Sequence, residues 1–261
     1  AERERARDRW EALPQAPAAR ADRAVSSPAA RATAEAVTRA AQRGQPLALI
    51  APPGIDPLPF AARYHLASDR RGGGLHVLDG ADPGLADLDL WRSEERSPLV
   101  RARGGTLLIA SPERLPQNVQ SYIGAATTGR LGLVVIVPRT VDALVANGEL
   151  DERLADRLGD RAVALPPLVA RAEDLRALVS DALVRAGLAY RGRPLGIEPA
   201  ALALVVEHGW PGNDLELESV MLRAALTAEE DVVTRADLTR AGLTPPPGAR
   251  SAPSRGRVRT D

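Results

Sequence analysis

The stretch PLALIAPPGIDPLPFAARYH, residues 46–65, has the layout of a phosphate-binding loop. An apolar run predicts a buried strand over residues 47–51, and a short loop and a helix-like stretch follow it. A phosphate-binding loop points successive backbone N–H groups at phosphate oxygens, and a lysine adds positive charge. Pro52, Pro53 and Pro57 have no N–H to donate, and the chain contains no lysine. The segment therefore stands where a phosphate-binding loop would stand, but it lacks the N–H groups and the lysine that bind phosphate.

Other residues offer little catalytic or metal chemistry. The absence of cysteine excludes disulfides, thiol catalysis and cysteine metal sites. His65, His76 and His208 are isolated and lack metal-ligand spacing, and no nucleophile elbow of G-x-S-x-G type is present. We therefore expect no metal site, and a structural role for His65.

Composition excludes several classes of partner. The 261 residues suffice for one large domain or two small ones. Arginines and acidic residues number 34 each, so no net field favours DNA, a membrane or an acidic substrate. The longest apolar runs are too short to span a bilayer, and the charged start lacks a signal region. A cytoplasmic protein is the expectation.

Apolar runs and helical patterns predict an α/β fold followed by a helical one. Strand-like runs alternate with helices or loops, which is typical of a parallel sheet flanked by helices (47–51, 75–78, 106–109 and 131–137). After Leu165-Pro166-Pro167-Leu168 the pattern becomes helical (173–186, 199–207, 214–226 and 234–238).

These patterns predict four segments of the chain. They are a charged helix or linker, the α/β domain, a small all-helical domain and a disordered tail rich in Pro and Arg (1–24, 25–165, 166–243 and 244–261). The tail arginines could contact nucleic acid, but a plain flexible tail is the favoured interpretation (Arg250, Arg255, Arg257 and Arg259).

Four segments resemble one family when taken in order. GGTLLIASPERLP (104–116) is similar to the Walker B segment G-G-T-L-F-L-D-E-I-G-E-L-P, and LPPLVARAEDL (165–175) to L-P-P-L-R-E-R-R-E-D-I. WPGNDLELESVMLRAAL (210–226) resembles W-P-G-N-V-R-E-L-E-N-V-I-E-R-A-V, and SSPAARATAEAVTRAA (26–41) the segment that opens the domain. Over roughly residues 25–240 the chain thus resembles the central AAA+ domain of sigma-54-dependent transcriptional activators. The resemblance implies a P-loop-type sheet with a helical lid, ring assembly and ATP-driven remodelling of sigma-54 RNA polymerase.

The nucleotide-site positions depart from that family. Its G-E-x-G-T-G-K-E falls on APPGIDPL (51–58), where Gly54 fits, Asp56 replaces a glycine and Pro57 replaces the lysine. Ala110 and Ser111 occupy the positions of the Walker B acids that hold magnesium and polarise water. Glu113 lies two residues further on, where we expect a surface glutamate.

The sensor and finger positions also differ. Pro138 replaces the sensor asparagine and Leu215 the lid's sensor arginine. Of the two arginines in F-R-x-D-L-x-x-R-L, Asp151 replaces the first and Arg157 retains the second. Arg157 is either a relic arginine finger at an interface or part of a salt bridge. The family's sigma-54-contacting loop G-A-F-T-G-A is absent from residues 88–106.

The retained residues are structural, and the altered ones handle nucleotide and polymerase. We therefore expect a catalytically inactive AAA+-like regulatory or scaffolding module without ATP, magnesium or another cofactor. Its partners would be proteins, either AAA+ relatives or further copies of the chain, with no membrane. One alternative is a functional regulator that binds ATP through atypical residues, and another is a DNA-binding regulator acting through the tail or further domains.

Overall fold

The structure, a computed structural model, describes residues 25–127, 129 and 131–243 of the 261-residue chain. The expected N-terminal helix or linker and the expected C-terminal tail lie outside the described residues. No described helix is both long and apolar enough to cross a membrane.

By its contacts the chain forms two compact units. Unit 1 extends to Leu178 and also contains Trp210–Leu217, where the chain returns to it. Unit 2 consists of Val179–Gly209 and the chain from Glu218 onward. The chain therefore passes from one unit to the other three times, after residues 178, 209 and 217. The sequence predicted a single boundary between the two domains, after residue 165.

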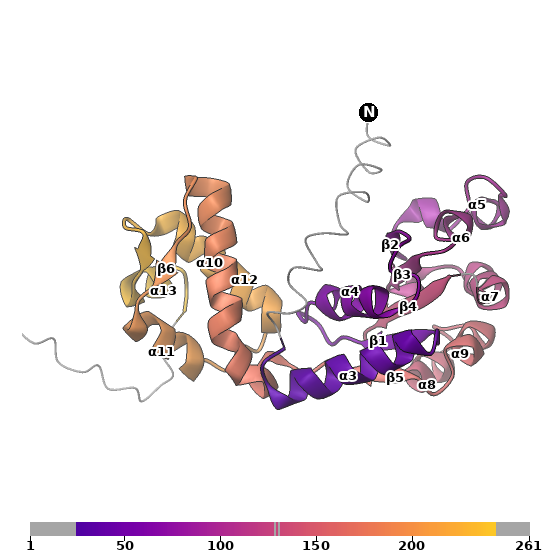
Figure 1. Ribbon diagram of the computed structural model, residues 1–261, viewed down its shortest axis with the longest axis horizontal. Coiled ribbons are helices and arrows are strands. Elements are labelled where there is room, and N and C mark those ends of the chain that lie inside the picture. Colours follow the sequence, from indigo (N-terminus) through magenta and orange to yellow (C-terminus); the bar gives the residue numbers. More distant parts are fainter. Residues whose placement is uncertain (1–24, 128, 130, 244–261) are drawn as a thin grey trace, which may run out of the picture. The chain divides into compact units, whose positions relative to one another are not determined.

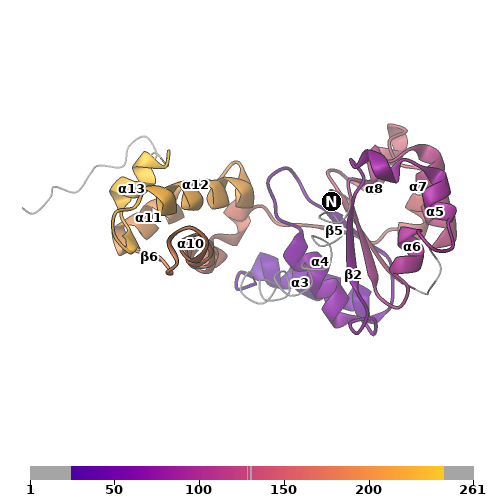
Figure 2. The same ribbon diagram turned by 90° about the horizontal axis from the view of Figure 1, so that it is seen from above.

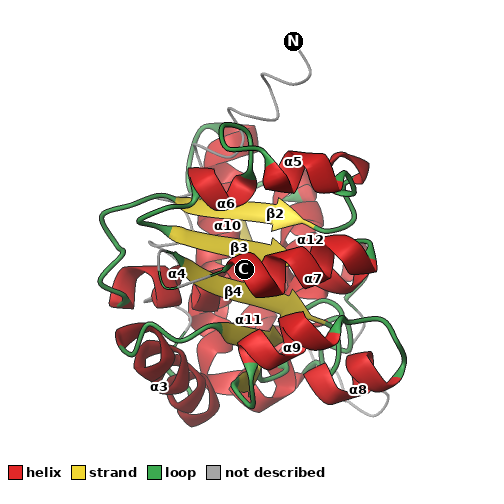
Figure 3. Cartoon of the chain, turned by 90° about the vertical axis from the view of Figure 1, so that its right-hand side faces the viewer, coloured by secondary structure: helices red, strands yellow, loops and turns green. Residues whose placement is uncertain are grey.

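Unit 1 is built on a parallel five-stranded sheet with the strand order β2-β3-β4-β1-β5 (β1 Leu47–Ile50, β2 Leu75–Asp79, β3 Thr106–Ala110, β4 Gly132–Val137 and β5 Ala162–Ala164). Figure 3 shows the arrows of β2, β3 and β4 pointing the same way. The first four strands match the predicted ones. Strand β5, which has three residues and borders the sheet, was not predicted.

Helices cover both faces of this sheet (Figures 1 and 2). Leu47 and Leu49 face a core formed with α3 and α4, whereas Ala48 between them faces the core on the opposite side. This alternation is the period of two of a strand buried on both faces. In the described part of the chain, one face carries two helices and the other five (α3 Pro28–Gln42 and α4 Leu58–Ala67; α5 Leu88–Arg92, α6 Pro98–Arg101, α7 Gln117–Ala126, α8 Val141–Ala146 and α9 Glu152–Leu158). The predicted α/β class with a helix-flanked parallel sheet is confirmed.

The start of α3 is fixed by a residue far along the chain. Asp174 is fully buried, and its Oδ1 accepts hydrogen bonds from the N–H groups of Ser26 and Ser27 at 2.7 and 2.8 Å. The Ser27 hydroxyl donates to Asp174 Oδ2 at 2.9 Å and accepts from the N–H of Ala30 as the N-cap of the helix. Asp174, which matches the aspartate of the family motif L-P-P-L-R-E-R-R-E-D-I, thus has a structural role in fixing the start of α3.

Unit 2 is mostly helical, as predicted. It contains α11, α13 and the larger parts of α10 and α12, together with a two-stranded sheet that the sequence did not indicate (α10 Leu175–Arg191, α11 Pro199–Glu207, α12 Asn213–Thr227, α13 Arg235–Arg240, β6 Gly196–Ile197 and β7 Val232–Val233). Its interior is apolar, with Leu183, Val205, Met221 and Leu238 fully or almost fully buried.

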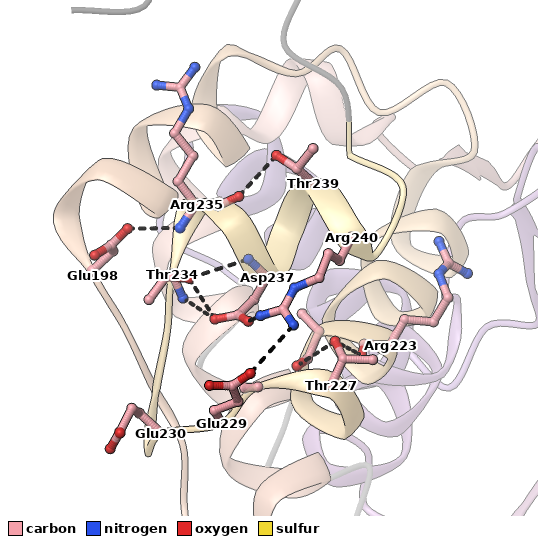
Figure 4. A network of polar contacts seen from close by, with 12 residues as sticks. Glu198, Arg223, Thr227, Glu229, Glu230, Thr234, Arg235, Asp237, Thr239 and Arg240 are labelled. Atoms are coloured by element: carbon pink, nitrogen blue, oxygen red, sulfur yellow. Dashed lines mark hydrogen bonds and ion pairs between the residues drawn. The ribbon is translucent and has the colours of Figure 1, made fainter. Parts of the chain in front are cut away.

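A polar network holds α13 in unit 2 (Figure 4). Thr234 and Asp237 form a capping box, in which each side chain accepts a hydrogen bond from the backbone N–H of the other. Arg240 forms an ion pair with Asp237, and the N–H of Arg235 donates to Glu198 Oε1 at 2.7 Å. These contacts fix the start of α13 and its attachment to the rest of unit 2.

Candidate functional site

Residues 51–58, the connection between β1 and α4 together with the first residue of α4, lie at the carboxyl ends of the parallel strands, where α/β folds bind ligands. We call them loop 51–58. Within the loop, the N–H of Ala51 donates to Val137 O at 2.9 Å and that of Ile55 to Pro52 O at 3.2 Å. The N–H of Leu58 donates to Asp56 Oδ1 at 3.1 Å. The three prolines have no N–H to donate.

The N–H of Asp56 is also engaged. It donates to Asp214 Oδ2 at 3.0 Å. Among the described residues, only the N–H of Gly54 in this loop has no hydrogen-bond partner. A phosphate cradle needs several convergent N–H groups, so one free group is not sufficient.

Gly54 has a second, steric role. Its φ is +84°, and a Cβ at this position would lie 2.2 Å from the backbone oxygen of Gly212. Its own carbonyl accepts a hydrogen bond from the N–H of Leu215 at 2.9 Å, and Asn213 Nδ2 donates to Pro53 O at 3.2 Å. The loop is thus packed against the segment 210–217, within unit 1.

Asp214 carries the charge at this contact. Both of its carboxylate oxygens accept hydrogen bonds from Arg171 Nη2, at 2.8 and 2.7 Å. Only 2% of Arg171 and 7% of Asp214 are exposed. The same carboxylate therefore binds a buried guanidinium and a backbone amide of the loop. We call these three groups, the N–H of Asp56, the Asp214 carboxylate and the Arg171 guanidinium, the loop clamp.

The Walker B position offers no carboxylate. Ala110 ends β3, and its carbonyl accepts from the N–H of Gly80 at 2.7 Å. Ser111 has the left-handed backbone conformation, with φ and ψ both 50°, and its N–H donates to Ile136 O at 3.0 Å. Both residues stand at the carboxyl edge of the sheet, and neither side chain offers the carboxylates that hold hydrated magnesium and polarise water in the family.

Glu113 is less exposed than a surface glutamate would be. It is half-buried in the short 3₁₀ helix η2 (Pro112–Arg114), and its Oε2 is buried without a hydrogen-bond partner in the described chain. Burial, with a smaller contribution from nearby Glu149, raises the pKa of Glu113 above its usual range. Within the described residues, no three acidic or histidine side chains form a group that could hold a metal ion.

The sensor positions lie near loop 51–58 but carry no polar side chain. Pro138 follows β4 at the carboxyl edge, beside the end of β3. Leu215 contributes its backbone N–H to Gly54, while its side chain is 65% exposed. Neither residue presents a polar side chain to loop 51–58.

Arg157 lies away from the loop. Helix α9 leads into the amino end of β5, so its last turn lies near the sheet edge opposite loop 51–58. The half-buried Arg157 side chain has an Nε that is buried without a partner among the described residues. Asp151, at the other finger position, caps α9 by accepting from the N–H of Arg153 at 2.9 Å.

The buried histidine is structural within the described chain. His65 is 6% exposed, and its Nδ1 lies 2.9 Å from Thr106 Oγ1. Burial, with a contribution from His76, lowers the pKa of His65.

Sequence reasoning missed Asp214 and Arg171. The signal was present in two of the four motifs. Arg171 is retained in LPPLVARAEDL, and an acid stands in WPGND where the family motif has valine. No sequence spacing pairs these residues, because 43 positions separate them. The fold brings them together.

Comparisons with known proteins support this architecture. A family model described as the AAA+ ATPase lid domain matches residues 170–253. The Nif-specific regulatory protein of Azotobacter vinelandii is 33% identical over 64% of this chain and 30% of its own length. The nitrogen assimilation regulatory protein NtrX of Azorhizobium caulinodans is 28% identical over 82% of this chain and 52% of its own length.

Solved structures agree on the fold. NtrX from Brucella abortus in complex with ATP has a TM-score of 0.66 at 24% identity, over 81% of this chain and 55% of that one. Domain III of the Thermotoga maritima replication initiation protein DnaA has a TM-score of 0.60 at 16% identity, over 85% of this chain and 94% of that one.

The chain spans only about a third of the length of several regulatory relatives, for example 30% of the Nif-specific protein and 36% of the alginate regulator AlgB of Pseudomonas aeruginosa. The fold, the lid match and these relatives agree with the four motifs. The chain has an AAA+-type α/β fold with an AAA+ lid and resembles the central domain of sigma-54-dependent transcriptional activators.

Proposed function

We propose that this chain is a catalytically inactive AAA+-like module with a regulatory or scaffolding role. The observation that carries the proposal is the state of loop 51–58. Three of its residues lack an N–H, and four donate their N–H within the chain. A nucleotide phosphate would meet one free amide and no lysine, where a working loop offers several amides and a positive charge.

The second half of the site supports the same conclusion. Ala110 and Ser111 offer no carboxylate for hydrated magnesium, and Pro138 offers no amide for a phosphate. Leu215 turns an apolar side chain outward where a sensor arginine would approach. We therefore propose that neither ATP nor magnesium is a cofactor of this chain.

Proteins are the proposed partners, either AAA+ relatives or further copies of this chain. Arg157 is consistent with this part of the proposal, because the chain retains it at a finger position of the family motif and part of its side chain reaches solvent. The relatives carry names of regulatory proteins, which is consistent with a regulatory partner. Any contact with DNA would come from residues 244–261 or from further domains.

The alternative is ATP binding through atypical residues, for which Gly54 and Arg157 are the remaining candidates. It predicts ATP-dependent oligomers that disappear in Arg157→Ala.

Turnover and sizing experiments test the proposal together. The chain is incubated with ATP and magnesium, and phosphate release and hydrodynamic size are measured for wild type and Arg157→Ala. NtrX from Brucella abortus, whose structure contains ATP, serves as a nucleotide-binding comparison in the same sizing experiment. We expect phosphate release at background and no ATP-dependent change in size. Turnover above background, or ATP-dependent assembly that requires Arg157, would overturn the proposal.

A further inference from the structure

We propose that Asp214 is an intrachain ligand of loop 51–58, and that its carboxylate takes the place of an external oxyanion on the amide of Asp56. The inference rests on the proposed function in so far as it interprets residues 51–58 as a nucleotide-type loop. It adds the identity of the group that this loop now binds.

The contact has the chemistry of anion recognition. A backbone N–H donates to a carboxylate oxygen at 3.0 Å, which is a charge-assisted hydrogen bond of the kind a phosphate oxygen would accept. The guanidinium of Arg171 supplies the positive charge, at 2.7 and 2.8 Å from the two oxygens. The loop clamp therefore contains an amide, an anion and a cation, as a phosphate loop with its lysine and its ligand does.

Burial makes this arrangement specific. Arg171 and Asp214 are almost completely removed from solvent, and an unpaired buried charge is strongly unfavourable. The guanidinium therefore holds the carboxylate in place, and Oδ2, which accepts from Arg171, also accepts from the loop amide. An external anion would have to displace a group that is covalently tethered and already neutralised.

Three further contacts position the carboxylate. The N–H of Leu215 donates to Gly54 O. The Asn213 side chain makes the other two contacts: its Nδ2 donates to Pro53 O, and its Oδ1 accepts from the N–H of Leu168 at 2.9 Å. Asn213 has a φ of +51°, so the backbone is turned where the clamp begins. The segment 210–217 is thereby fixed on the loop from both sides of Asp214.

As a consequence, the conformation of loop 51–58 seen here does not depend on a bound nucleotide. In a loop that binds an external phosphate, the ligand's presence or absence changes what the amides contact. Here the ligand is part of the chain and is always present. The loop clamp thus replaces a nucleotide-dependent contact with a permanent one inside unit 1.

Amide hydrogen exchange of the full chain, measured by NMR without nucleotide, tests the inference. The test variant is the double replacement Asp214→Leu with Arg171→Met, which removes both charges at once, so no uncompensated buried charge remains. The matched control is Glu216→Gln, which removes a negative charge from the same segment. Glu216 accepts a hydrogen bond from the N–H of Gly212 and lies outside the loop clamp.

The expected result is local. Exchange of the Asp56 amide should accelerate about 10- to 100-fold in the double variant, the range that corresponds to a lost charge-assisted hydrogen bond. Exchange of Ala48, whose N–H donates to Arg161 O in the sheet, should stay unchanged and report that the unit remains folded. In Glu216→Gln the Asp56 amide should keep its protection.

Unchanged protection of Asp56 in the double variant would overturn the inference. If the Ala48 amide also loses protection, the same comparison is made with the double replacement Asp214→Ala with Arg171→Gln, which again removes both charges and leaves no acceptor on residue 214; it should accelerate Asp56 selectively. Exchange of Asp56 no faster than in wild type would then overturn the inference. Because no nucleotide is present, ATP binding by the wild type would contradict the proposed function without affecting this result.

Discussion

Replacement of Gly54 by alanine tests how tightly the loop is held. The new Cβ would lie 2.2 Å from Gly212 O, a backbone atom that cannot rotate away, at a φ of +84°. The left-handed backbone alone costs an alanine about 1–2 kcal/mol. Moving the loop to relieve the clash would also weaken the bonds from Leu215 to Gly54 and from Asp56 to Asp214, at about 1 kcal/mol or more each.

The sum is about 3–5 kcal/mol of lost unfolding free energy for Gly54→Ala. Gly148→Ala is the matched control, because Gly148 has a φ of +69° and an added methyl group there would meet nothing within 4 Å. It should lose only about 1–2 kcal/mol from the backbone conformation. The measurement is urea unfolding followed by circular dichroism and tryptophan emission, since Trp91 and Trp210 are buried in unit 1. Equal destabilisation of the two variants would refute the close approach of loop and segment.

Two further predictions concern buried carboxylates. Asp174→Ala should lower the unfolding free energy by about 3–5 kcal/mol, because three hydrogen-bond donors lose a buried acceptor. The exposed control Asp69→Ala should change the unfolding free energy, measured with urea, by no more than about 0.5 kcal/mol. An equal loss in both variants would refute the role of Asp174 in fixing the start of α3. For Asp237, burial raises the pKa, but hydrogen bonds from Thr234 and the ion pair with Arg240 outweigh it and hold the pKa below its usual range. The folded pKa is thus the lower one, so this stabilisation is present above the unfolded value, about 3.9, and is lost as the pH falls through the folded value. Urea midpoints should therefore show a larger loss for Asp237→Asn at pH 7 than at pH 3; equal losses would contradict the assignment.

The general architecture could be predicted because it depends on local patterns. The runs that became β1, β3 and β4 are apolar along almost their whole length, and such runs specify a covered parallel sheet in the sequence itself. Strand β5 was not predicted, because Ala162–Ala164 is too short to show a pattern. It becomes a strand by pairing with its one neighbour, β1.

The site was only half predictable. Loss of the lysine and of the N–H groups at Pro52, Pro53 and Pro57 is visible in the sequence, because it depends on residue type alone. The group that now occupies the Asp56 amide is not visible. Asp214 lies 158 positions away, and its contact depends on how the chain returns to unit 1 at Trp210.

The partition between units was also beyond local patterns. The sequence pattern places residues 166–178 and 210–217 in a helical domain, because the helical patterns at 173–186 and 214–226 begin within them. Contacts such as that of Asp174 with Ser27 place them in unit 1, although α10 and α12 continue into unit 2. A helix pattern indicates which face is buried, but it does not identify the element that buries it.

We propose that this AAA+-type chain does not bind nucleotide in its β1–α4 loop. Isothermal titration of the chain with ATP and magnesium at micromolar to submillimolar concentration tests that claim most directly. We predict no heat beyond that of dilution. Saturable binding with a micromolar dissociation constant that is weakened in Gly54→Ala would contradict the account.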